Sequence, residues 1–123
     1  GAQHLQIITD FDNTISPRTV NGERCLPTME VFTASNRTSQ EYKKHVKELF
    51  DYYYPREIDT TLPFLERVQL LIEWVKKEGD ALAKENLTLE DAELIMAESN
   101  LAMREYFPKL VDIIMDHDLK CFI

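Results

Sequence analysis

The residues of this sequence that could carry chemistry are two acids near its N-terminus. Asp10 and Asp12 flank Phe11 and precede Thr14, directly after the apolar run 5–9. Two carboxylates at this spacing can take separate roles in a phosphoryl transfer. Asp10 can attack phosphorus, while Asp12 protonates the departing alkoxide and later takes a proton from water. Asp10 must be ionised to attack, and a bound Mg²⁺ would hold it so while offsetting charge on the phosphoryl oxygens.

The Asp-x-Asp spacing alone also fits an ordinary turn, because Asp and Asn are common where a strand ends. It also occurs as the metal motif of nucleotide-sugar glycosyltransferases. That motif normally lies deep within a nucleotide-binding domain, whereas here it follows the first expected strand, so this reading is disfavoured. An apolar strand followed by Asp-x-Asp-x-Thr resembles the first signature of the haloacid dehalogenase superfamily.

Composition restricts the partners. The net charge of −8 argues against a nucleic-acid polymer, which is usually held by clustered Lys and Arg, but leaves a small anion such as phosphate possible. Cys25 and Cys121 lie far apart and form no disulfide framework, and the first apolar run is too short for a signal peptide or a membrane span. We therefore expect a cytoplasmic protein that does not contact a membrane.

The elements that must position the acids begin with a short buried strand, Leu5–Thr9, which places Asp10 at its carboxyl end. Residues 16–35 contain Pro and Asn-Gly with little periodicity, which predicts a loop or a small hairpin. A helix is expected after Ser39 as its N-cap, ending at Pro55.

A second helix is expected from Pro63, with a break or bend at Gly79. Its apolar residues form one stripe, which consists of Phe64, Val68, Leu71, Ile72 and Val75. Thr88 and Asp91 approximate a capping box for a third helix over 89–99, whose apolar periodicity can continue to Phe107. The remaining expected elements are a helix over 109–116, opened by Pro108, and a second strand over 119–123.

These elements predict an α/β fold with a long helical insertion between two strands. The predicted division is 1–18 as the start of the α/β core, 19–107 as a mainly helical insertion, and 108–123 as the return to the core. Two parallel strands alone make a poor sheet, because parallel sheets need more strands and helices on both faces. We therefore expect that the remainder of a longer chain is needed to complete the sheet.

The resemblance extends beyond the two acids. Five stretches look like the cytosolic 5′-nucleotidase III family, the pyrimidine and 7-methylguanosine monophosphate nucleotidases: LQIITDFDNT (5–14), NGERC (21–25), YYPREID (53–59), EW (73–74) and AESN (97–100). The likeness implies a haloacid-dehalogenase-like Rossmannoid core, of which only the first strands are present, with an inserted α-helical cap domain. It also implies Mg²⁺-dependent hydrolysis of nucleoside 5′-monophosphates through an aspartyl-phosphate intermediate.

The resemblance further implies residue roles. Asp10 would be nucleophile and magnesium ligand, and Asp12 would be general acid and base that also binds magnesium through its backbone carbonyl. Glu57 would recognise the base. The other residues that the likeness places at the substrate are Phe11, Thr14, Trp74 and Ser99. Without the resemblance, Glu57 is interpreted as a solvated surface acid and Trp74 as a core-packing residue.

The sequence departs from the family where nucleobase stacking is expected. Val75 stands where the family usually has an aromatic ring, and Ser16-Pro17-Arg18 replaces another aromatic position. A stacked ring contributes about 1–3 kcal/mol per base, so the base preference stays open. The family's later Ser, Lys and acidic motifs are not present in these 123 residues, so we expect the chain alone to be inactive.

Two alternatives to a nucleotidase remain. One is another capped phosphatase of the superfamily, acting on phosphoserine or a sugar phosphate. The other is a noncatalytic fragment or pseudo-enzyme that only binds a partner or a nucleotide.

Overall fold

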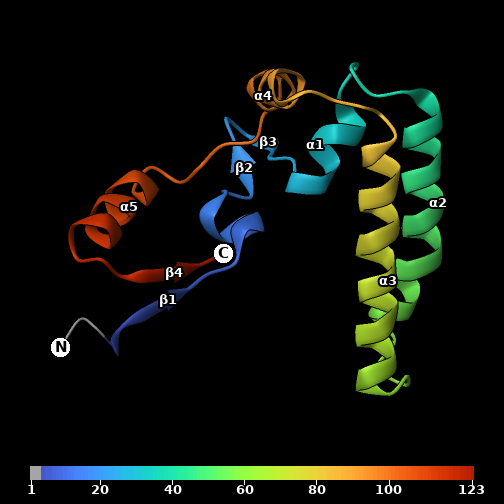
Figure 1. Ribbon diagram of the computed structural model, residues 1–123, viewed down its shortest axis with the longest axis horizontal. Helices are drawn as coiled ribbons and strands as arrows, with labels where there is room; N and C mark the ends of the chain where they lie inside the picture. The colour runs from blue at the N-terminus through green and yellow to red at the C-terminus, as the bar shows by residue number, and fades with distance from the viewer. Residues whose placement is uncertain (1–3) are drawn as a thin grey trace. The chain divides into compact units, whose positions relative to one another are not determined.

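The computed structural model describes residues 4–123, which are mostly helical and divide into two compact units (Figure 1). The first unit comprises the chain up to Val31 together with Met96–Ile123, and the second comprises Phe32–Ile95. Both junctions lie within the predicted insertion 19–107, and the predicted division of the chain into core and insertion stays a prediction.

The first unit contains a two-stranded parallel sheet, in which β1 (Gln6–Ile8) pairs with β4 (Lys120–Phe122) (Figure 1). Both strands were predicted, but β1 was expected to be buried. That expectation is wrong, because Ile8 is 79% exposed. A parallel strand becomes buried when helices cover both faces of its sheet, and within residues 4–123 the sheet has only two strands.

A tight turn follows β1 over Phe11–Ile15, and a two-residue hairpin follows the turn. Strands β2 (Thr19–Val20) and β3 (Glu23–Arg24) are joined by Asn21 and Gly22, whose φ values of 51° and 83° are those of a hairpin turn that favours Asn-Gly. The small hairpin is therefore confirmed. The helix α1 (Thr28–Ala34) was not predicted, and it lies in the stretch assigned to loop or hairpin.

The second unit is built on two long helices that lie side by side, α2 (Gln40–Glu57) and α3 (Phe64–Ala83) (Figure 1). The N-cap assignment is confirmed, since the Ser39 side chain accepts a hydrogen bond from the Tyr42 N–H at 3.0 Å. Tyr53 is 2% exposed, and its ring stacks on that of Trp74 with centroids 6.0 Å apart. Aromatic packing between α2 and α3 thus contributes to the core of this unit, together with buried Leu49, Ala81 and Ile95.

Two expectations for these helices are wrong. Pro55 lies inside α2 rather than ending it, because a proline in the last turn removes only one backbone hydrogen bond and Ile58 N–H still reaches the Tyr54 carbonyl at 3.3 Å. Gly79 lies within an uninterrupted α3, where its cost of about 1 kcal/mol is offset by packing of its neighbours. The predicted α3 apolar stripe is largely exposed, with Phe64 70% exposed, whereas the face toward α2 includes Trp74.

Helix α4 (Leu89–Glu98) begins at the predicted capping box, which is confirmed. The Thr88 N–H donates to Asp91 Oδ2 at 2.9 Å, and the Asp91 N–H donates to Thr88 Oγ1 at 3.1 Å. The predicted continuation toward Phe107 is wrong, because Ser99 takes up backbone groups at the helix end: its hydroxyl donates to the Met96 carbonyl at 2.8 Å and accepts from the Leu101 N–H at 3.2 Å.

Helix α5 (Phe107–Asp116) starts two residues before the predicted 109, with Pro108 in its first turn. Over the part of the chain that the structure describes, no helix has the length and apolar composition needed to span a membrane.

Candidate active site

Asp10 lies where β1 ends and is exposed to solvent. It occupies the N-cap position of the Phe11–Ile15 turn with an extended backbone, at φ −86° and ψ 160°. The Thr14 hydroxyl donates to Asp10 Oδ2 over a long 3.4 Å. A carboxylate that is accessible and restrained by the next turn is available both for attack and for metal coordination.

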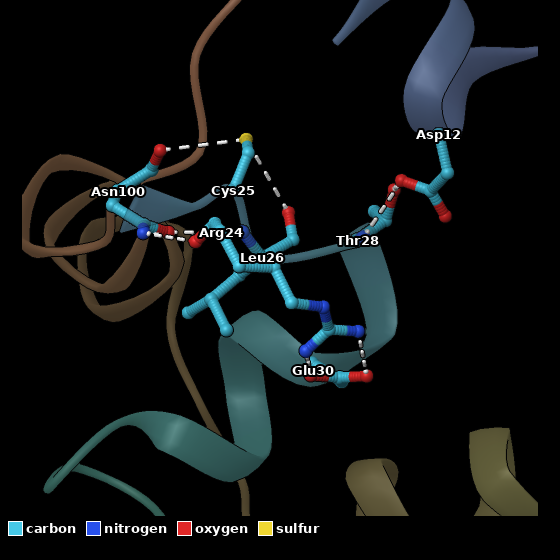
Figure 2. A network of polar contacts seen from close by, with 7 residues as sticks. All are labelled: Asp12, Arg24, Cys25, Leu26, Thr28, Glu30 and Asn100. Atoms are coloured by element: carbon cyan, nitrogen blue, oxygen red, sulfur yellow. Dashed lines mark hydrogen bonds and ion pairs between the residues drawn. The ribbon is translucent and has the colours of Figure 1, made fainter. Parts of the chain in front are cut away.

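Asp12 is held much more firmly than Asp10. Its Oδ1 accepts two hydrogen bonds from Thr28, one from the backbone N–H at 2.9 Å and one from the hydroxyl at 2.7 Å (Figure 2). Thr28 is the first residue of α1. A contact between residues sixteen positions apart thus fixes the orientation of the second acid.

The backbone of the acidic turn is held by Arg104. Its Nε donates to the Thr14 carbonyl at 2.7 Å, its Nη2 donates to the Asn13 carbonyl at 3.1 Å, and its backbone N–H donates to the Ile15 carbonyl at 2.9 Å. Asn13 has a φ of 61°, a conformation that Asn adopts more readily than most residues. The three contacts stabilise a turn that would otherwise leave carbonyl groups without protein partners.

The segment that follows α4 also holds the hairpin. The Asn100 side chain donates to the Arg24 carbonyl at 2.6 Å and accepts from the Leu26 N–H at 2.9 Å (Figure 2). The buried Cys25 thiol donates to the Asn100 carbonyl at 3.5 Å. Asn100 and Arg104 therefore tie the same returning segment to the hairpin and to the acidic turn.

A third carboxylate, Glu30, is close enough for the charge of Asp12 to affect it, but it is paired elsewhere. Arg24 donates to both Glu30 oxygens at 2.7 and 2.8 Å (Figure 2). This hydrogen bonding holds the pKa of Glu30 below its usual range, against the smaller opposing effects of burial and of the Asp12 charge. Glu30 is therefore kept ionised near neutral pH and is a poor proton donor.

The metal-binding capacity of these residues is limited. The described residues, 4–123, contain no group of three or more His, Cys, Asp or Glu side chains that could hold a metal ion. Mg²⁺ usually keeps several waters and is bound through one or two carboxylates plus substrate phosphate oxygens. The Asp10 carboxylate and the Asp12 carbonyl are hard oxygen donors that fit a site of that kind.

The other predicted site residues are distributed over both units. Phe11 is half-buried in the acidic turn, where its carbonyl accepts from the Ser16 N–H at 2.9 Å. Ser99 belongs to the first unit, and its hydroxyl is engaged by backbone groups at the end of α4. Glu57 and Trp74 belong to the second unit.

Glu57 lies half-buried in the last turn of α2. The Trp74 indole N–H donates to Glu78 at 2.8 Å and its ring stacks on Tyr53, so its polar edge and one face are used within the unit. This arrangement matches the packing role that its apolar helix suggests. The roles of Glu57, Trp74 and Ser99 in substrate binding stay predictions.

Sequence reasoning did not find Thr28 or Arg104. Pro27 before Thr28, with Glu30 in the following turn, is a signal for a helix start that could have indicated α1. Arg104 follows an irregular segment with no motif around it, and only the folded backbone brings its guanidinium to the acidic turn.

Comparison with known proteins assigns the family. The family model described as pyrimidine 5′-nucleotidase (UMPH-1) matches residues 13–123, and the chain therefore belongs to this family. The two acids precede the matched range. They lie within the region aligned to individual relatives, which covers the whole chain.

Two curated relatives and one solved structure illustrate the similarity. The chain is 32% identical over 123 residues to the 7-methylguanosine phosphate-specific 5′-nucleotidase of Gallus gallus, and 33% identical over 123 residues to 7-methylguanosine phosphate-specific 5′-nucleotidase A of Xenopus laevis. Each alignment covers 100% of this chain but only 43% and 42% of the relative. The chain therefore spans less than half the length of these relatives.

The crystal structure of cytosolic 5′-nucleotidase IIIB bound to cytidine superposes on the fold with a TM-score of 0.79 and 25% sequence identity. The superposition covers 98% of this chain and 41% of that chain. The resemblance inferred from the five stretches is thus confirmed by family, by sequence and by fold.

Proposed function

We propose that this chain carries the nucleophile segment of a magnesium-dependent 5′-nucleotidase that hydrolyses nucleoside 5′-monophosphates through an aspartyl-phosphate. The observation that carries the proposal is the pair of acids at the end of β1: Asp10 is exposed, while Asp12, two residues on, is fixed by two hydrogen bonds from Thr28. Family membership and the names of the relatives support the substrate class.

In the first step an Asp10 carboxylate oxygen attacks phosphorus and the bond from phosphorus to O5′ breaks. The electron pair of that bond goes to O5′, which takes a proton from Asp12, and the nucleoside leaves. In the second step water attacks phosphorus, Asp12 accepts its proton, and release of phosphate restores the Asp10 carboxylate. When bound, Mg²⁺ would supply positive charge that offsets the negative charge of the phosphoryl oxygens.

We place β1, β4 and α5 in a haloacid-dehalogenase-like Rossmannoid core, and the inserted helices in a cap domain that bears Glu57 and Trp74 for the nucleoside. The relatives are more than twice as long as this chain, and we expect the 123 residues alone to be inactive because they offer only part of a magnesium site. The solved relative is described as cytosolic, and we propose the same compartment here.

No single contact within the described residues identifies which nucleobase the proposed substrate carries. The curated relatives are named for 7-methylguanosine phosphate, the family model for pyrimidine nucleotides, and the solved relative holds cytidine. Val75, at the position of the family's stacking ring, is an aliphatic residue that is 61% exposed.

Phosphate release by the full-length protein tests the proposal. We expect hydrolysis of cytidine, uridine and 7-methylguanosine 5′-monophosphates with kcat/KM well above that for phosphoserine and sugar phosphates. Magnesium removal with a chelator should abolish turnover, and added Mg²⁺ should restore it. Equal rates with all phosphomonoesters would reject the nucleotidase assignment in favour of another phosphatase, and no turnover with any of them would favour a noncatalytic protein.

A further inference from the structure

We infer that Thr28 is a positioning residue for Asp12: it keeps Oδ1 as a hydrogen-bond acceptor and so selects Oδ2 as the oxygen that gives and takes the proton. The inference rests on the proposed function and adds to it a residue and an atom.

Two hydrogen-bond donors meet on one oxygen of the Asp12 carboxyl. Across residues 4–123 the hydrogen bonds to the Asp12 carboxyl are those from the Thr28 N–H, at 2.9 Å, and the Thr28 hydroxyl, at 2.7 Å, and both end on Oδ1 (Figure 2). A backbone N–H can only donate. A proton on Oδ1 would compete with both donors for the same oxygen, so the protonated carboxyl carries its proton on Oδ2, and loss of the hydroxyl donor weakens this preference.

Thr28 can perform this task because its own backbone is fixed. Pro27 precedes it with a restricted φ, and the Pro27 carbonyl accepts from the Glu30 N–H at 3.0 Å in the first turn of α1. One residue before Pro27, the Leu26 N–H donates to the Asn100 side chain at 2.9 Å. The two Thr28 groups that donate to Asp12 are therefore anchored to the hairpin and to α1. Arg104 anchors the turn that bears Asp12.

A purely structural role for the same contact is the main alternative. Asp12 accepts from the first N–H of α1, so the contact could serve only to cap that helix. Loss of a cap would disturb the whole turn and slow attack on any substrate. Loss of proton positioning would slow attack only when the leaving group needs a proton.

The two roles separate with a matched pair of substrates. In a nucleoside 5′-monophosphate the bond that breaks leaves an alkoxide, which is strongly basic and needs the proton of Asp12. In the nucleoside 5′-phosphorothiolate, sulfur replaces the bridging oxygen and the departing thiolate is a far weaker base. Both substrates present the same nucleoside and the same phosphoryl group to Asp10.

The experiment measures phosphoenzyme formation by rapid quench in the full-length protein with its magnesium. Thr28→Val keeps the backbone donor and the branched shape but removes the hydroxyl donor. We expect it to slow phosphorylation by the ester about tenfold or more and by the phosphorothiolate by less than about threefold. Thr28→Ser retains the hydroxyl and should stay within about threefold of wild type on both substrates. Thr19→Val, an exposed residue of β2 in the same unit, is the matched control and should change neither rate.

Equal slowing with both substrates, or no slowing with either, overturns the role assigned to Thr28. Thermal unfolding monitors folding of each variant, and if Thr28→Val does not fold, Thr28→Ala gives the same rate comparison. A double variant with Asp12→Asn adds a second test, because removing the Thr28 hydroxyl should slow the ester no further once the carboxyl is gone. A wild-type protein that forms no phosphoenzyme with the ester removes the proposed function, and this inference with it.

Discussion

The hydrogen bonds from the Arg104 guanidinium to the acidic turn predict a loss of activity when the guanidinium is removed. Arg104→Met keeps a side chain of similar length but loses the hydrogen bonds to Thr14 O at 2.7 Å and Asn13 O at 3.1 Å. The backbone N–H still reaches Ile15 O at 2.9 Å, so the turn retains one of its three contacts with Arg104. At about 1 kcal/mol per hydrogen bond, the loss is about 2 kcal/mol. If the turn must hold this geometry for attack, kcat falls about thirtyfold.

Steady-state phosphate release by the full-length protein, with far-UV circular dichroism as a check of folding, measures this loss. Arg104→Lys preserves the charge but cannot reach both carbonyls with a planar fork, so it should recover only part of the rate. Lys109→Met removes an exposed cation from the same unit and serves as the control for net charge. A folded Arg104→Met variant whose kcat stays within about twofold of wild type would show that these two hydrogen bonds do not hold the turn for attack.

Two further predictions concern the second unit. Ser39→Ala removes the cap on the Tyr42 N–H and should lower the free energy of unfolding by about 1 kcal/mol in urea titration; an unchanged value contradicts the assigned cap. Burial raises the pKa of Glu78, opposed by the hydrogen bond from Trp74, so its folded value lies above the unfolded value of 4.5. Its contribution to stability is then fully present below that value and lost as the pH rises through the folded value. Glu78→Gln keeps an acceptor for Trp74 and should raise the Tm by calorimetry more at about pH 7.5 than at about pH 4; an equal gain at both contradicts the assigned cause.

Local signals in the sequence were enough to place most elements. Ser39 and Thr88 cap their helices as predicted, because a side-chain oxygen at a helix start acts on residues within one turn. The Asn-Gly turn and the pair of strands β1 and β4 are also present where their residues suggest. In each case the determining interactions lie within a few residues or within a short apolar run.

Sequence reasoning failed where tertiary contacts determine the outcome. Pro55 was taken as a helix end and Gly79 as a break or bend, but α2 and α3, which pack against each other, continue through these residues. The same holds for the acidic turn: the contacts of Asp12 with Thr28 and of Thr14 with Arg104 span 16 and 90 positions. Spacing could suggest which acids react, but not which residues hold them.

The resemblance to the family provided what local patterns could not, namely the expectation of a substrate class and of a cap. The structure adds a separate observation: β1 and α3 each expose large apolar side chains, since Ile8 is 79% exposed and Phe64 is 70% exposed. Large apolar side chains that gather on an exposed face indicate an interaction surface.

The role of Asp10 as nucleophile is tested by locating the residue that becomes phosphorylated. The full-length protein is mixed with a nucleoside 5′-monophosphate and Mg²⁺, quenched in acid within the first turnover, and digested for peptide mass spectrometry. The mechanism predicts a mass increase of about 80 Da on the peptide that contains Asp10, acid-stable and lost in hydroxylamine as expected of an acyl phosphate, and absent from Asp10→Asn. A phosphorylated residue other than Asp10, or a phosphoenzyme that persists in Asp10→Asn, would contradict the account.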